Sequence, residues 1–326
     1  MLQAPTFQDV LKARQVVNRY LRPTALHFYP ALSDLLGFHA YVKHENHQPV
    51  GAFKVRGGVY LVSQMSEEER QRGVITASTG NHGQSIAYAG WLFGVQALIG
   101  VPEGANPGKV AAMRALGAEV RFHGPDFDAA REYVEQLAAK EGYRYVHAGN
   151  EPHLIAGVGT YALEILEDLP DVETIIVPVG GGSGASGICT VFKTARPSVK
   201  VIGVQAAAAP AAYKSWKAKK LVQDRTETFA EGLATRTAFA LPQRILWEHL
   251  DDFVLVSEEE MRRAILLMLE KTHNLAEAAG AASLAAAVKL KERLAGRKVA
   301  LVLSGGNLSV DKLRWALGGD AHDRTR

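Results

Sequence analysis

Along this chain, short segments rich in β-branched residues alternate regularly with helical segments. Seven segments have the pattern of buried strands, at residues 74–77, 95–101, 118–122, 174–179, 200–205, 253–256 and 299–303. Helical patterns at 81–93, 108–116 and 278–288 lie between them, and Ser257 with Glu260 forms a capping-box pattern that opens a further helix. This alternation predicts an α/β protein whose mostly parallel sheets are covered by helices.

Composition excludes several classes of protein. A length of 326 residues is enough for about two domains. Lys and Arg number 37 against 34 Asp and Glu, a net charge of +3 that is too even for an electrostatic nucleic-acid binder. No apolar run approaches the ~20 residues of a membrane span, and the single cysteine, Cys189, is typical of a reducing compartment. We therefore expect a soluble, cytoplasmic protein with neither nucleic-acid nor membrane partners.

A glycine-rich turn follows the strand at 174–179 and leads into a helical pattern; it reads Gly180-Gly181-Gly182-Ser183-Gly184. Glycines let the backbone approach an anion closely, and a helix N-terminus supplies unpaired N–H donors, so the turn predicts a phosphate site. With Gly187 the turn also satisfies the dinucleotide pattern G-x-G-x-x-G. That alternative needs a carboxylate at the end of the next strand, which instead ends in Gln205 and Ala206.

Three further segments can carry chemistry. The segment 78–84, Ser-Thr-Gly-Asn-His-Gly-Gln, joins a strand to a helix and suits a carboxylate ligand. In the segment 51–58, Lys54 lies among apolar residues and glycines, which can desolvate its amine and make it a nucleophile. Ser304, in the turn 304–307, follows a strand and can face a ligand at the carboxyl edge of the sheet.

In order and spacing, these four segments resemble the pyridoxal-phosphate enzymes of the serine/threonine dehydratase and serine racemase family, over nearly the whole chain. The segments 22–24, 155–160 and 231–234 extend the resemblance. It implies fold type II, the tryptophan synthase β-like fold: two doubly wound domains with pyridoxal 5′-phosphate in the cleft between them. The large domain would comprise 1–72 plus 150–326, and a small inserted domain, 73–149, would close over substrate. The family also suggests a homodimer.

The resemblance also implies roles for single residues. Lys54 would bind the cofactor through its amine and remove the substrate α-proton, and Phe53 would pack beside the ring. The cofactor phosphate would be bound by Gly180, Gly181, Gly182, Ser183 and Gly184. Asn81 would contact the ring hydroxyl, and Ser304 would face the ring nitrogen. The substrate carboxylate would be bound by Ser78, Thr79, Gly80, Asn81 and His82.

A serine at the ring nitrogen makes the cofactor a weaker electron sink than an aspartate would, which favours prompt loss of a β-substituent. We therefore expect a carbon–nitrogen lyase that converts a β-hydroxy amino acid, L-threonine or L-serine first, to a 2-oxo acid and ammonia. Phenylserine or 3-hydroxyaspartate as substrate, serine racemisation and β-replacement stay open as alternatives.

Some positions depart from the family pattern. Racemase-like members carry a catalytic serine where this chain has Thr79, so Thr79 is a candidate acid/base on the opposite face of the substrate. The usual His-Pro-x-Asp stretch reads His147-Ala148-Gly149-Asn150, which bears on the substrate pocket.

We expect no metal site. Racemase-like members carry acidic metal ligands near Gln205, but residues 205–212 contain no carboxylate here. His39, His44 and His47 cluster with Glu45, yet their spacing matches no zinc motif. We expect them to be surface or turn histidines.

Overall fold

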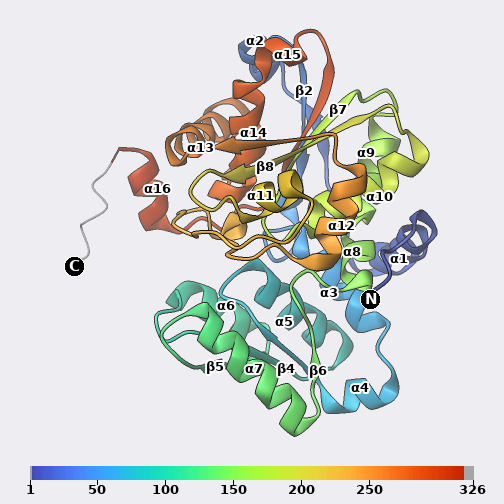
Figure 1. Ribbon diagram of the computed structural model, residues 1–326, viewed down its shortest axis with the longest axis vertical. Coiled ribbons are helices and arrows are strands. Elements are labelled where there is room, and N and C mark those ends of the chain that lie inside the picture. Colours follow the sequence, from blue (N-terminus) through green and yellow to red (C-terminus); the bar gives the residue numbers. More distant parts are fainter. Residues whose placement is uncertain (1, 319–326) are drawn as a thin grey trace. The chain divides into compact units, whose positions relative to one another are not determined.

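The computed structural model describes residues 2–318, which form two sheets (Figure 1). The six-stranded sheet has the order β1-β2-β10-β7-β8-β9, and only the β1–β2 pair is antiparallel. Its strands are β1 (Leu26–Phe28), β2 (His39–His44), β7 (Thr174–Pro178), β8 (Lys200–Ala206), β9 (Asp252–Val256) and β10 (Lys298–Leu303). The four-stranded sheet is wholly parallel, in the order β5-β4-β3-β6, with β3 (Val74–Ala77), β4 (Ala97–Val101), β5 (Glu119–Phe122) and β6 (Arg144–Tyr145).

The described chain divides into two compact units. The first unit comprises residues 2–22 and 48–160 and contains the four-stranded sheet; the second comprises 23–47 and 161–318 and contains the six-stranded sheet. Residues 23–47 belong to the second unit because β2 pairs with β10 along its whole length. The predicted inserted domain, 73–149, lies within the first unit, and its closure over substrate stays a prediction.

The helices are distributed over both units. Those of the first unit are α1 (Phe7–Tyr20), α3 (Lys54–Ser63), α4 (Glu67–Arg72), α5 (Asn81–Phe93), α6 (Pro107–Ala115), α7 (Phe127–Glu141) and α8 (Pro152–Val158). Those of the second are α2 (Pro30–Leu36), η1 (Glu45–His47), α9 (Thr160–Asp168, which begins at the boundary), α10 (Ser183–Ala195), α11 (Ala211–Ala218), η2 (Glu231–Leu233), α12 (Ala240–His249), α13 (Glu258–Thr272), α14 (Ala278–Lys289), α15 (Lys291–Leu294) and α16 (Val310–Ala316).

Glycines let the helices of the first unit pack unusually closely. A Cβ placed on Gly58 of α3 would lie 2.3 Å from Ser85 Oγ of α5. A Cβ on Gly57 would lie 2.7 Å from the Leu154 carbonyl oxygen of α8. Because the glycines place no side chain at these contacts, α3 packs closely against both α5 and α8. This packing fixes the position of the first residue of α3, Lys54.

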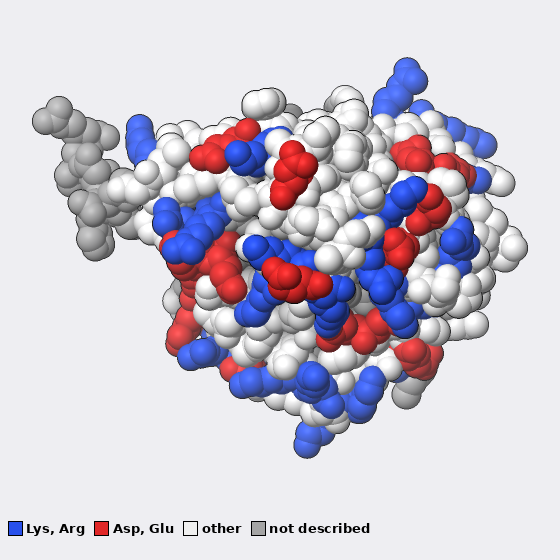
Figure 2. Space-filling model, turned by 90° about the horizontal axis from the view of Figure 1, so that it is seen from above, with Lys and Arg blue, Asp and Glu red and all other residues white. Residues whose placement is uncertain are grey.

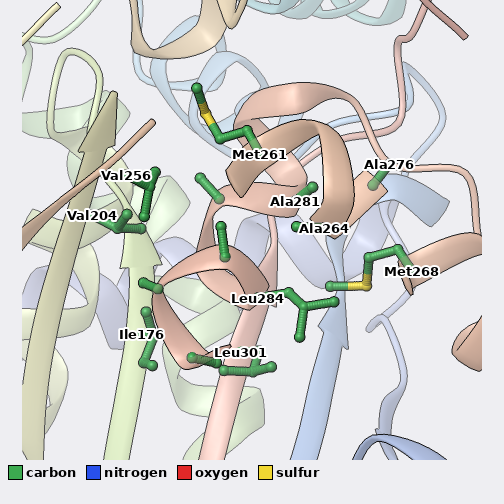
Figure 3. Packing of buried hydrophobic residues seen from close by; sticks show 14 of the residues in the cluster. Ile176, Val204, Val256, Met261, Ala264, Met268, Ala276, Ala281, Leu284 and Leu301 are labelled. Carbon is green, nitrogen blue, oxygen red and sulfur yellow. The ribbon is translucent and has the colours of Figure 1, made fainter. Parts of the chain in front are cut away.

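The core of the second unit is built on the alanine-rich helix predicted at 278–288, which is confirmed as α14. Figure 3 shows Ala281 and Leu284 of α14 packed between α13 and the strands. The cluster also includes Met261, Ala264 and Met268 of α13 and Ile176, Val204 and Leu301 of the sheet. Small side chains let α14 lie close to the strands, so the sheet that carries the glycine turn has a densely packed support.

All seven predicted strands are present, each with ends within two residues of the predicted ones. The capping box at Ser257 is confirmed, with Glu260 N donating to Ser257 Oγ at 3.2 Å. No helix of the described chain is long and apolar enough to cross a membrane. On the face shown in Figure 2, basic and acidic side chains are interspersed, in keeping with the net charge of +3.

Candidate active site

Lys54 stands at the first position of α3 in the first unit. Its Nζ donates a hydrogen bond to the Ala148 carbonyl oxygen at 3.2 Å and lies 5.4 Å from the centre of the Phe53 ring. The Lys54 carbonyl in turn accepts a hydrogen bond from Ser85 Oγ at 2.7 Å. Burial lowers the pKa of the Lys54 amine to about 8. A substantial fraction of the amine is therefore neutral near physiological pH and able to act as a base or nucleophile.

The predicted carboxylate segment, 78–82, joins β3 to α5 in the same unit. Gly80 is the N-cap of α5 and, lacking a side chain, makes no side-chain capping bond to the first turn. Ser78 Oγ accepts a hydrogen bond from the Gly80 N–H at 3.2 Å and shapes the turn. The first-turn N–H groups of this 13-residue helix are thus suited to an anion such as a carboxylate.

His82 is buried in the first turn of α5, and its side chain is turned toward β3. Its Nε2 lies 3.0 Å from Thr76 Oγ1, and Thr76 Oγ1 donates to the Val146 carbonyl oxygen at 2.7 Å. Thr79 is half-buried, and its role as an acid or base stays a prediction.

The segment 147–150, where the sequence departs from the family pattern that it otherwise resembles, contains the carbonyl that contacts Lys54. His147 Nδ1 accepts the backbone N–H groups of Gly149 and Asn150, both at 3.0 Å. These bonds require His147 to be unprotonated at Nδ1, and burial lowers its pKa to about 4. His147 thereby fixes the turn whose Ala148 carbonyl receives the Lys54 amine. Sequence reasoning marked the stretch 147–150 as bearing on the substrate pocket, but it missed the contact of Ala148 with Lys54, because a backbone carbonyl leaves no signal in the residue type.

In the second unit, the glycine turn 180–184 runs from β7 into α10 as predicted. A Cβ on Gly180 would lie 2.0 Å from the Gly232 carbonyl oxygen, and one on Gly181 would lie 2.5 Å from the Phe239 ring. Gly182, the N-cap of α10, has a φ of 87° and forms no side-chain cap. Glycine is required at these positions, and the N-terminus of a 13-residue helix is left uncapped by side chains. The turn is therefore suited to an anion such as a phosphate, and its role at the cofactor stays a prediction.

Ser304 lies directly after β10 and is 6% exposed. Since β10 and β7 are parallel neighbours, their carboxyl ends bring Ser304 and the glycine turn to the same edge of the sheet. The Gly305 carbonyl accepts the Glu277 N–H at 3.1 Å, which fixes the turn after Ser304. The second unit therefore carries Ser304 and the predicted phosphate ligands, and the first carries Lys54, Phe53 and the segment 78–82.

The prediction of surface or turn histidines is wrong for His44. This side chain is fully buried at the end of β2, with its Nε2 2.9 Å from Tyr29 Oη and its ring stacked 5.0 Å from that of His47. Burial lowers the His44 pKa to about 4. Among residues 2–318, no group of three or more His, Cys, Asp or Glu side chains is arranged to hold a metal ion.

A family model described as pyridoxal-phosphate dependent enzyme matches residues 17–305. The chain belongs to this family. An L-threonine ammonia-lyase of Thermotoga maritima is 42% identical over 94% of this chain and 77% of the relative. An L-threo-3-hydroxyaspartate ammonia-lyase of Saccharomyces cerevisiae is 34% identical over 97% of both chains.

Two solved structures are similar over nearly their whole length. Threonine deaminase isoform 2 from Solanum lycopersicum superposes with a TM-score of 0.92 at 32% identity, covering 98% of this chain and 96% of that one. Serine racemase from Dictyostelium discoideum superposes with a TM-score of 0.88 at 32% identity, covering 94% and 99%. The predicted family, the α/β fold with mostly parallel sheets and the pyridoxal-phosphate cofactor are therefore confirmed.

Replacing Gly180 by alanine is expected to weaken cofactor binding about 5- to 100-fold. The new methyl group would overlap the Gly232 carbonyl, and overpacking of this kind costs ~1–3 kcal/mol. Cofactor titration followed by absorbance measures the effect. The matched control is Gly104→Ala, at a position where a Cβ meets nothing within 4 Å. Equal cofactor affinities for the wild type and the Gly180 variant would contradict the assignment of this turn.

Proposed function

We propose that this protein is a pyridoxal-phosphate-dependent ammonia-lyase that converts L-threonine, and L-serine less efficiently, to a 2-oxo acid and ammonia. The observation that carries the proposal is the Lys54 amine, which lies 3.2 Å from the Ala148 carbonyl oxygen and has its pKa lowered to about 8, in the same unit as a helix N-terminus without a side-chain cap, which suits a carboxylate. A base for the α-proton and a site for the α-carboxylate are the two parts that α,β-elimination from an amino acid requires. The ammonia-lyase of Thermotoga maritima, 42% identical, supports the same activity.

Each residue then has a defined task. When bound, pyridoxal phosphate withdraws electrons from the substrate α-carbon, so that a proton can leave and the β-hydroxyl can follow. Lys54 would anchor the cofactor and, when its amine is free, would accept the α-proton. The turn 180–184 would hold the phosphate, Phe53 and Asn81 would contact the ring, and Ser304 would face the ring nitrogen. Residues 78–82 hold the substrate carboxylate.

Lys109, which sequence reasoning missed, adds a positive charge to this carboxylate site. Its Nζ lies 3.9 Å from a Cβ built on Gly80. Gly83 lets α6, the helix that carries Lys109, pack close to α5. A Cβ on Gly83 would lie 2.7 Å from Sδ of Met113, which is one turn beyond Lys109 on α6. The ammonium can serve the α-carboxylate of any amino acid, or the second carboxylate of 3-hydroxyaspartate. It therefore favours 3-hydroxyaspartate as the second candidate substrate.

Lys109→Met is expected to raise KM for L-threonine about tenfold and to change kcat less than twofold, because charge-assisted contacts contribute ~1.5–3 kcal/mol when made directly. Lys109→Arg, which keeps the charge, should recover most of the loss. Steady-state kinetics with L-threonine and L-threo-3-hydroxyaspartate separate the two roles. A loss restricted to hydroxyaspartate would assign Lys109 to a side-chain carboxylate, and unchanged KM for both substrates would remove it from the site.

The experiment that tests the proposed function is 2-oxo acid release by the cofactor-saturated protein. The substrates are L-threonine, L-serine, D-serine, threo-phenylserine and L-threo-3-hydroxyaspartate. We expect the highest kcat/KM with L-threonine. Formation of D-serine from L-serine without 2-oxo acid would instead assign racemisation and point to Thr79. Turnover only with an added thiol or sulfide would assign β-replacement.

The same proposal includes a cytoplasmic homodimer in which the segment 73–149 closes over substrate. Burial of reactive intermediates away from water is the physical reason for such closure. Light scattering of the purified protein measures the oligomeric state, for which we expect twice the chain mass.

A further inference from the structure

His82 is held in a single tautomer by its neighbours. Thr76 Oγ1 uses its only proton in the 2.7 Å hydrogen bond to the Val146 carbonyl. The 3.0 Å contact between Thr76 Oγ1 and His82 Nε2 must therefore have His82 as the donor. The proton of the neutral imidazole is on Nε2, which leaves Nδ1 as a bare acceptor.

This acceptor is buried and unsatisfied. The His82 side chain is 6% exposed, and Nδ1 receives a hydrogen bond from no described residue. Burial, and to a smaller extent the charge of Lys54, lowers the pKa of His82 to about 3. Nδ1 is therefore not protonated near neutral pH and stays an acceptor. Leaving a buried acceptor without a donor costs ~1–3 kcal/mol, so a donor is expected in another state of the enzyme.

The donor can be identified from the surroundings of His82. Ser85 lies one turn beyond His82 on the same face of α5, and its Oγ binds the Lys54 carbonyl at 2.7 Å. On the other side, Lys54 Nζ binds the carbonyl of Ala148, two residues after the Val146 carbonyl that anchors Thr76 and His82. The titratable groups that act on His82 are Lys54 from α3 and His147 from the segment after β6. Of these two, only the Lys54 amine has N–H groups on a flexible stem.

We propose that His82 Nδ1 and the Ala148 carbonyl oxygen form a pair of acceptors that hold the Lys54 amine once the substrate amine has replaced it on the cofactor. A neutral amine has two N–H bonds and one lone pair. The two acceptors take the two N–H bonds, and the lone pair remains directed away from them, free to accept the substrate α-proton. His82 is then a positioning residue for the base. This inference rests on the proposed role of Lys54.

Two substitutions separate the two nitrogens of His82. Asparagine places its Oδ1 the same number of bonds from the backbone as Nδ1, so H82N keeps the acceptor and loses the bond to Thr76. Glutamine places its Nε2 as far out as the imidazole Nε2, so H82Q keeps the bond to Thr76 and loses the acceptor. Relative to wild type, we expect H82Q to lower kcat about tenfold and to enlarge the α-deuterium isotope effect, with KM within twofold. H82N should retain several-fold more activity than H82Q.

The pH profile gives a readout that a merely structural role does not move. An acceptor stabilises the ammonium form of Lys54, so its loss in H82Q should shift the acidic limb of the kcat profile to lower pH. H82N should leave the limb near its wild-type position. Equal losses in both variants, with an unshifted limb, would show that His82 acts through packing alone and would overturn the proposal. Should either His82 variant fail to fold, Thr76→Val takes the place of that variant. This substitution removes the hydroxyl that fixes the His82 tautomer, and its kcat and pH profile are compared with those of the wild type.

A second readout needs no catalysis. In cofactor-saturated protein labelled with ¹⁵N-histidine and given glycine, which has an amine but no β-substituent to lose, the His82 Nδ1 resonance should be that of an unprotonated, hydrogen-bonded nitrogen. It should move to the position of a free acceptor in Lys54→Met. No change on this substitution contradicts the acceptor pair. Wild-type protein that releases no 2-oxo acid but shows the expected shift would refute the proposed function and leave this inference standing.

Discussion

Lys54→Ala is expected to lower kcat for 2-oxobutanoate formation from L-threonine by about 10⁴-fold, because general-base catalysis alone contributes about 10²–10⁴ and the covalent anchor of the cofactor is lost as well. The cofactor should still bind the turn 180–184, whose geometry does not depend on Lys54. Assays with saturating cofactor separate the loss of the base from the loss of cofactor affinity. The control is Lys140→Ala, which removes an exposed lysine of the same unit and should leave kcat unchanged. A Lys54 variant with more than a tenth of wild-type kcat would remove this residue from the chemistry.

The same residue sets the expected pH dependence. The pKa of the Lys54 amine is lowered from 10.5 to about 8 by burial, so the neutral, proton-accepting form gains population as the pH rises through 8. Activity that depends on this base should fall as the pH drops below 8, about tenfold per pH unit once the amine is mostly protonated. A rate profile that is flat from pH 6 to 9 would contradict this role.

Lys43→Met is expected to have the largest effect on stability, lowering the free energy of unfolding by ~3–5 kcal/mol, because breaking a buried ion pair by removing one member is strongly destabilising. The Lys43 ammonium is fully buried and donates to Glu164 Oε2 and to the Thr24 carbonyl, both at 2.6 Å. Glu164 is 6% exposed, and its carboxylate, which also accepts the Thr24 N–H at 3.1 Å, would lose the ammonium that faces it.

Thermal and urea unfolding measure this effect, and a melting temperature lower by about 10 °C is expected. The double variant Lys43→Met, Glu164→Leu should recover much of the loss, since replacing both members of a buried pair by apolar groups is often nearly neutral. If Lys43→Met alone melts within 1 °C of the wild type, the ion pair between Lys43 and Glu164 does not contribute the expected stability.

The strands that are apolar throughout could be predicted from the sequence, because a buried parallel strand has the same composition whatever its neighbours are. β2 could not. Its last residues, Lys43 and His44, are polar, and they are buried only because Glu164 and Tyr29 pair with them across the fold. β1 and β6 were missed because they are three and two residues long. Burial of polar side chains depends on partners that no local pattern contains.

The same distinction holds for the site. The residues at 54, 78–82, 180–184 and 304 could be predicted because glycine spacing and strand ends mark them, although their individual roles stay predictions. Ala148 and Val146 act through carbonyl oxygens, which every residue has, so nothing in the sequence marks them. Lys109 was missed because its closeness to Gly80 depends on how α6 packs against Gly83.

The most direct test of the central claim is the stoichiometry of a single reaction. Purified protein saturated with pyridoxal phosphate is incubated with L-threonine and no other amine or thiol, and ammonia and 2-oxobutanoate are quantified together. We predict that both accumulate at equal rates, and that neither accumulates with Lys54→Ala. Threonine that is consumed without 2-oxobutanoate, or left unchanged by a protein that carries bound cofactor, would contradict the assignment of this chain as an ammonia-lyase.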